Sequence, residues 1–173
     1  MPRLPRYAML FVVLVLALLS SWLPIPAGAD GGGSEGARSS IQPEDPQYSA
    51  AVKAIKANEY AKAIPLLESV VSRDGKNADA YNWLAYATRK TGNPAGSLPI
   101  YQKALAIDPK HRGAHEYIGE AYLMLDNLAK AKEHLRALDS LCVFSCSEYR
   151  HLKKAVDVYE KSEGKTKPTA SSW

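Results

Sequence analysis

The sequence lacks the short motifs with which many enzyme families bind phosphate, activate a nucleophile or hold catalytic zinc. No glycine-rich phosphate loop, nucleophile elbow or zinc-protease helix occurs in its 173 residues. His111 and His115 are four residues apart, as two metal ligands on one helical face could be, but no third ligand is evident. Glu116 and Glu120 fit a solvated helix face better than a catalytic dyad. We therefore expect no enzymatic activity, no metal and no cofactor.

The sequence also has little excess charge of either sign. Its 22 lysines and arginines stand against 18 aspartates and glutamates, which gives a formal net charge of +4. Two of the basic residues, Arg3 and Arg6, precede an apolar run at the start of the chain. A nucleic-acid-binding surface needs a larger and more clustered basic excess. Nucleic acid is therefore not an expected partner.

Cysteine is scarce, because Cys142 and Cys146 are the only two in the chain. In an exported protein an even number of cysteines favours a disulfide, which is the pairing we expect here. A thiol-redox or copper site is the alternative, since two thiolates and a histidine can hold Cu(I) and His134 and His151 are near in sequence. Against a redox site, three residues separate the cysteines rather than the usual two. Free thiols are the third possibility.

The start of the chain has the order of regions typical of a secretory signal peptide. Basic residues precede an unbroken apolar run over 9–19, and small residues follow at Ala27 and Ala29. We predict that residues 1–29 are a signal peptide cleaved between Ala29 and Asp30, which leaves no stable membrane anchor. An uncleaved anchor is the alternative, but the apolar run is short of the ~20 residues that a membrane span needs. Residues 30–43, rich in glycine and serine, are expected to form a flexible linker.

A repeated pattern of small and apolar residues organises the rest of the chain. In the stretch 78–109, residues at helical spacing occur on both sides of the break at Gly92-Asn93-Pro94, which predicts two amphipathic helices in a hairpin. The same residue classes recur 34 positions earlier and later. The small residues in phase are Ala51, Ala85 and Gly119, then Ala63, Ser97 and Ala131, and the turns in phase are Asn58-Glu59, Gly92-Asn93 and Asp126-Asn127.

This pattern resembles the tetratricopeptide repeat, a family of helix pairs that recur every ~34 residues. The resemblance implies an all-α fold, a right-handed α-solenoid of three repeats at about 44–77, 78–111 and 112–145. The small residues would lie where the two helices of one hairpin cross. A capping helix at about 146–161, with Ser145 and Glu148 at capping-box spacing, completes a domain at 44–161. A disordered tail at 162–173 is expected to follow.

The resemblance also implies a function, because family members mostly hold peptides or partner proteins on the concave surface. The positions of this chain that align with the family's groove residues are Tyr48, Val52, Asn82, Tyr86, Arg89, Lys90, Glu116 and Glu120. The positions at which one subfamily clamps a C-terminal carboxylate hold Tyr48, Val52, Trp83, Gly113 and Tyr117, so this chain does not look like a carboxylate clamp. We expect a non-catalytic adaptor or scaffold, exported to a bacterial periplasm, with Tyr86 and Arg89 as candidate centres of binding.

Overall fold

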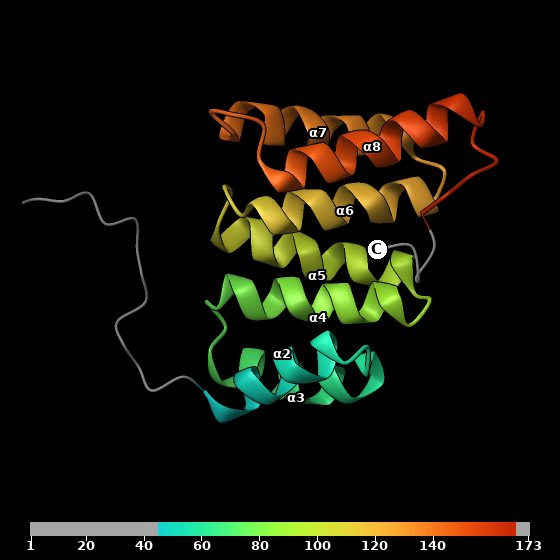
Figure 1. Cartoon of the computed structure of the whole chain (residues 1–173). Helices are drawn as coiled ribbons and strands as arrows, with labels where there is room; N and C mark the ends of the chain where they lie inside the picture. Colours follow the sequence, from blue (N-terminus) through green and yellow to red (C-terminus); the bar gives the residue numbers. More distant parts are fainter. Residues whose placement is uncertain (1–44, 169–173) are drawn as a thin grey trace, which may run out of the picture. The chain divides into compact units, whose positions relative to one another are not determined.

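The described part of the chain is made of helices alone. The structure is a computed structural model that describes residues 45–168, and these residues form seven helices and no strand. The three hairpins are α2 (Pro46–Lys56) with α3 (Tyr60–Arg73), α4 (Ala78–Lys90) with α5 (Pro94–Ile107), and α6 (Arg112–Met124) with α7 (Leu128–Leu141). The last helix, α8 (Ser147–Lys161), packs against α6 and α7 (Figure 1). The predicted all-α repeat solenoid is therefore confirmed.

The signal peptide, its cleavage site at Ala29 and Asp30, and the linker at 30–43 lie outside the described residues. Within 45–168, no helix is both long enough and apolar enough to cross a membrane.

Each hairpin turns through a residue with left-handed backbone at the same position of the repeat. Asn58, Gly92 and Asp126 have φ values of 59°, 90° and 60°, respectively. Glycine and asparagine tolerate this conformation best, because other side chains crowd the backbone there. Asp45 caps α2 by accepting from the Gln47 amide, and Asn93 caps α5 by accepting from the Gly96 amide, whereas Glu59 at the start of α3 makes no side-chain cap hydrogen bond. The first residue of each aligned turn therefore has the same left-handed backbone in all three hairpins, whereas the second caps the next helix only at Asn93 and Asn127.

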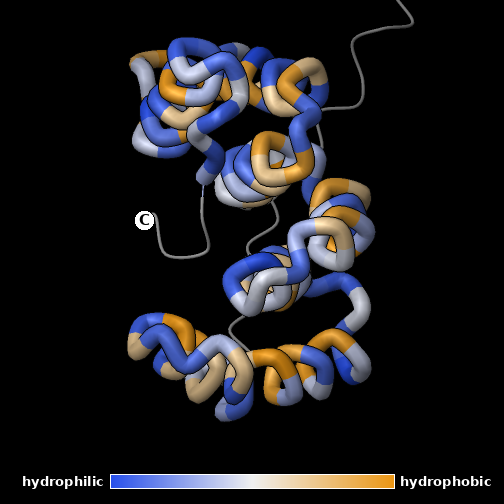
Figure 2. Tube along the Cα trace, turned by 90° about the vertical axis from the view of Figure 1, so that its right-hand side faces the viewer, coloured by the Kyte–Doolittle hydropathy of each residue, from blue (hydrophilic) through white to orange (hydrophobic). Residues whose placement is uncertain are grey.

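Apolar side chains pack in three groups of buried residues along the stack of helices. The first group joins α2, α3 and α4, the second joins α4, α5 and α6, and the third joins α6, α7 and α8. Hydrophobic and hydrophilic residues are interspersed along the helical tube, as expected when one stripe of a helix faces the interior (Figure 2). The small residues Ala63, Ser97 and Ala131 on the second helices are all fully buried.

Gly119 differs from the expectation that its small size serves the crossing within its own hairpin. A Cβ atom built there would lie 2.5 Å from Cδ2 and 2.8 Å from Cδ1 of Leu152, on α8. Leu152 is itself fully buried, so its side chain has little room to move aside. The absent side chain at Gly119 therefore admits the capping helix rather than α7.

The start of α8 also differs from the predicted capping box. Its N-cap residue is Cys146 and not Ser145, which has a positive φ of 30°. The Glu148 carboxylate accepts from the Ser147 hydroxyl at 3.0 Å, and the cap side chain makes no hydrogen bond. The structure pairs Cys142 with Cys146 in a disulfide with Cα atoms 5.6 Å apart. The chain therefore enters α8 through a disulfide-closed turn.

The segment that the sequence predicts to be a disordered tail begins with residues held to the repeat domain. The Lys167 ammonium group donates to the Asp126 carboxylate, which also accepts from the Tyr159 hydroxyl at 3.0 Å. Pro168 is buried. These contacts tie residues 162–168 to α8 and to the turn between α6 and α7.

The contact between Gly119 and Leu152 gives a test of how α8 docks. Gly119→Leu should lower the free energy of unfolding by about 1–3 kcal/mol, because overpacking a filled core costs that much. Chemical denaturation followed by circular dichroism measures the loss. Adding Leu152→Ala should recover part of it, since the second change removes the side chain that the first one meets. Losses that simply add in the double variant would contradict the assigned contact.

Candidate functional site

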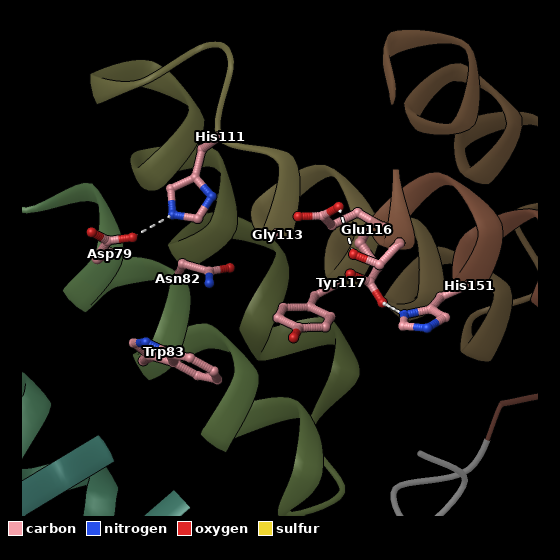
Figure 3. Close-up of a pocket in the computed structure, with 10 residues that line it drawn as sticks. Asp79, Asn82, Trp83, His111, Gly113, Glu116, Tyr117 and His151 are labelled. Atoms are coloured by element: carbon pink, nitrogen blue, oxygen red, sulfur yellow. Dashed lines mark hydrogen bonds and ion pairs between the residues drawn. The ribbon is translucent and has the colours of Figure 1, made fainter. Parts of the chain in front are cut away.

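A pocket of about 340 Å³ opens between the first helices of two repeats and the capping helix. Asp79, Asn82 and Trp83 line it from α4, and Glu116 and Tyr117 line it from α6 (Figure 3). The remaining lining residues are His111 and Gly113, at the start of α6, and Ser147, Glu148 and His151 on α8. Three elements that are far apart in the sequence thus form one pocket.

Two acid–histidine pairs flank this pocket. The Asp79 carboxylate lies 3.1 Å from Nε2 of His111, whose Nδ1 accepts from the Ala114 amide and so caps α6. On the other side, the Glu116 carboxylate lies 3.0 Å from Nδ1 of His151. Figure 3 shows the two pairs at opposite ends of the site. Each pair joins two of the three elements, because one connects α4 to α6 and the other connects α6 to α8.

The three pocket carboxylates differ in how readily they ionise. The hydrogen bond from His111 lowers the pKa of Asp79. Burial opposes ionisation of Glu148, but hydrogen bonds from its own backbone amide and from Ser147 outweigh burial and lower its pKa. Burial raises the pKa of Glu116 to about 8, helped by the negative charges of Glu120 and Glu148. At neutral pH the pocket therefore holds two ionised carboxylates and one that is largely protonated.

Aromatic rings line the interface between the first helices of the second and third repeats. The ring centroids of Tyr86 and Tyr117 lie 4.8 Å apart, and those of Trp83 and Tyr117 lie 6.4 Å apart. Tyr86 also meets Tyr60 of α3, edge to face, at 5.9 Å. All four rings are partly exposed. Trp83 and Tyr117 reach the pocket, whereas Tyr60 and Tyr86 extend the aromatic row away from it.

Arg89 differs from the sequence expectation that it lies free in the groove. Its side chain is 1% exposed and pairs with Glu120, which is 2% exposed, at 2.8 Å. The guanidinium group also lies 5.3 Å from the centre of the Tyr86 ring and 5.7 Å from that of Tyr117. Burial raises the pKa of Glu120, and the positive charge of Arg89 opposes that shift. This pair is an internal link between α4 and α6, and its groups are not accessible to a partner.

The remaining groove positions are divided between the pocket, the buried Lys90 beside the aromatic rings, and the partly exposed face of α2. Asn82 and Glu116 line the pocket, although both are nearly buried, at 4% and 6% exposed. The Lys90 ammonium group lies 5.6 Å from the centre of the Tyr60 ring and 5.7 Å from that of the Tyr86 ring, so it makes cation–π contacts with both. Tyr48 and Val52 are partly exposed on α2. Binding by these positions stays a prediction.

Of the eight groove positions named from the sequence, only Asn82 and Glu116 line the pocket. Asp79, His111, Ser147 and Glu148 were not groove candidates, and His151 was considered only as a thiol-site ligand. The missed residues on α8 could not be aligned, because that helix follows the last repeat. Asp79 and His111 lie 32 residues apart, close to one repeat length, so their approach across neighbouring repeats could have been noticed.

The histidines that a copper site would recruit are engaged elsewhere. His134 Nδ1 lies 2.9 Å from His115 Nδ1, and its ring stacks on Tyr122 at 5.7 Å. His151 faces Glu116. Within residues 45–168, no group of three or more histidine, cysteine, aspartate or glutamate side chains is arranged to hold a metal ion. The redox or copper alternative for Cys142 and Cys146 stays a prediction.

Comparison with known proteins identifies the family. Two family models, both described as Tetratricopeptide repeat, match residues 48–112 and 88–156, and together they span well over half of the chain. The chain belongs to the tetratricopeptide repeat family.

A curated relative and several solved structures are similar to this chain. Protein FlbA of Caulobacter vibrioides is 39% identical over 61 residues, which cover 35% of this chain and 10% of FlbA. This chain thus matches only about a tenth of that relative. The translocator chaperone SycD of Yersinia enterocolitica has a TM-score of 0.62 at 15% identity, over 68% of this chain and 83% of SycD. PcrH, in complex with the chaperone binding region of PopD, has a TM-score of 0.61 at 13% identity, over 68% and 90%.

The buried ion pair yields a prediction about stability. Arg89→Met should lower the free energy of unfolding by about 3 kcal/mol, because it leaves the Glu120 carboxylate buried without its cation. The double variant Arg89→Met, Glu120→Leu should recover most of that loss. Urea denaturation at neutral pH measures both effects. Lys90→Met, which removes a neighbouring cation with no direct ion pair, is the matched control and should cost less. Equal losses for the two single variants would argue against the pair.

Glu116 yields a prediction about pH. Because its folded pKa of about 8 lies above the ordinary value of 4.5, the unfolded chain releases this proton at lower pH than the folded chain does. The stability that protonated Glu116 contributes is therefore lost as pH rises from about 4.5 to about 8. Denaturation curves at several pH values should show wild type losing stability relative to Glu116→Gln over this range. A difference that is independent of pH would refute the raised pKa.

Proposed function

We propose that this chain is a non-catalytic adaptor that binds a peptide segment of a partner protein in the pocket between α4, α6 and α8. The pocket itself carries the proposal. It combines the partly exposed rings of Trp83 and Tyr117 with polar groups that converge from three elements. A concave site that combines apolar faces with a few fixed polar groups is typical of ligand-binding sites in general. PcrH, which shares the fold, supports the proposal because its structure contains a bound segment of PopD.

The fold makes a pocket of this kind suited to a peptide. Each repeat contacts only its neighbours, so the first helices present a continuous surface rather than an enclosed cavity. Trp83 gives a large rigid ring whose burial costs little conformational entropy, and such residues often dominate binding energy. The pocket groups are hydrogen-bonded in pairs across elements, as Asp79 is to His111. The surface is therefore shaped before a partner arrives, which lowers the entropic cost of binding.

We further propose that the adaptor works in the envelope of a bacterial cell. The support is the order of basic, apolar and small residues in the first 29 positions. Mass spectrometry of the protein recovered from a periplasmic extract should then find Asp30 as its first residue. A chain that keeps residues 1–29 and stays in the cytosol would contradict this location.

A peptide selection tests the binding site. Linear peptides selected from a random library for binding to the full chain should bind Trp83→Ala at least tenfold more weakly, because truncating a central aromatic anchor typically costs about 2 kcal/mol or more. Fluorescence anisotropy measures the affinities, and circular dichroism checks that the variant is folded. Val158→Ala truncates an exposed residue of α8 that does not line the pocket and should bind normally. Selected peptides that bind both variants alike would place the site elsewhere.

A further inference from the structure

The pocket lining is acidic, because it includes carboxylates but no lysine or arginine. Three of the lining residues are carboxylates, namely Asp79, Glu116 and Glu148, in a chain whose net charge is positive. Two histidines, His111 and His151, face the first two of these acids. Arg112 approaches Glu148 from outside the lining, at 3.7 Å, which is too far for a hydrogen bond. Arg89 lies beneath, already paired with Glu120.

One lining residue, Asn82, has a buried side-chain oxygen that lacks a hydrogen-bond donor, and a bound ligand could supply that donor. Asn82 is 4% exposed, and its side-chain oxygen has no hydrogen-bond partner. Figure 3 shows its amide directed into the space between α4 and α6. A buried acceptor without a donor costs roughly 1–3 kcal/mol, so a ligand that brings an N–H group would relieve this cost. The missing partner is therefore a hydrogen-bond donor.

The aromatic residues fit the same kind of ligand. Trp83 and Tyr117 both line the pocket, and their ring faces carry partial negative charge that attracts a cation. The backbone leaves room beside them at Gly113. A Cβ atom there would lie 3.4 Å from His111 Cε1 and 3.5 Å from Asn82 Nδ2, so the absence of a side chain keeps this part of the pocket open.

We infer that the pocket receives a lysine or arginine side chain of the bound peptide. This inference rests on the proposed function and specifies its ligand. Ionised Asp79 and Glu148 supply the opposite charge, the Asn82 oxygen accepts an N–H, and the rings of Trp83 and Tyr117 cover the cation. An acidic side chain or a terminal carboxylate is disfavoured, because it would meet Asp79 and Glu148, and the one arginine beside them, Arg112, is already paired with Glu148.

The test uses pools of capped decapeptides, so that no terminal charge contributes. Each pool has arginine, lysine, glutamine or glutamate fixed at the central position and random residues elsewhere, and its binding to the full chain is measured by fluorescence anisotropy. The arginine and lysine pools should bind roughly tenfold more tightly than the glutamine pool, as expected for charge-assisted hydrogen bonds. The glutamate pool should bind most weakly. In a single peptide isolated from the arginine pool, citrulline in place of the arginine should cause a similar loss.

Variants of the protein separate the pocket from general electrostatics. Glu148→Gln and Asp79→Asn should each reduce the preference for basic pools. Glu68→Gln, on the exposed surface of α3, changes the net charge equally and should leave the preference intact. Gly113→Ala keeps every charge and favours the helix, so it should fold at least as stably as wild type. By narrowing the pocket, Gly113→Ala should nevertheless weaken the binding of the arginine and lysine pools. This variant therefore tests the inference even if Glu148→Gln or Asp79→Asn fails to fold.

The outcomes distinguish the inference from the proposed function. Pools that bind without preferring a basic residue, or that prefer glutamate, would overturn the inference and leave peptide binding in place. A basic preference that survives Glu148→Gln, Asp79→Asn and Gly113→Ala would also overturn it, because the cation would then be bound elsewhere. Failure of every pool to bind would overturn the proposed function together with the inference.

Discussion

The buried ion pair between Arg89 and Glu120 sets how the second and third repeats meet. Both side chains are excluded from water, so neither can leave the other without exposing an uncompensated charge to the protein interior. The pair connects the last turn of α4 with the second half of α6, and the rings of Tyr86 and Tyr117 cover the guanidinium group. The pocket lies between the same two helices, towards their amino-terminal ends. The Arg89–Glu120 ion pair therefore holds α4 and α6, which form two walls of the pocket, and neither residue lines the pocket itself.

The sequence predicted most of the fold because the fold is periodic. Ala63, Ser97 and Ala131 occupy equivalent buried positions, and Asn58, Gly92 and Asp126 make equivalent turns, so a shift of 34 residues finds them all. Predictions were weaker wherever the chain departs from the repeat. Gly119 aligns with Ala85, but its neighbour is Leu152, since α8 lies on the far side of the last hairpin. The N-cap of α8 is likewise Cys146, at the end of the disulfide-closed turn, and it could not be predicted from the capping-box spacing of Ser145 and Glu148.

The candidate site was less predictable than the fold. Aligning the repeats shows on which face of a helix a residue lies, but it does not show how deeply the side chain is buried. Asn82 and Glu116 were placed correctly on the first helices and do line the pocket. Arg89 and Glu120 lie on the same helices, yet they form an ion pair with each other and both side chains are buried. Nothing in the spacing of one helix shows that a charge one repeat away will meet it. The contribution of α8 was invisible for a simpler reason: it has no equivalent in the other repeats.

Helix α8 has two roles that cannot be separated. It closes the apolar end of the last hairpin through Leu152 and Val156, and it supplies Glu148 and His151 to the pocket wall. Repeat arrays usually change length easily, since one unit can be added without disturbing distant ones. Here a repeat inserted after α7 would move α8 away from α6 and take one wall of the pocket with it. The length of this array and the lining of this pocket are therefore inherited together, and a longer relative would lack the wall that α8 supplies.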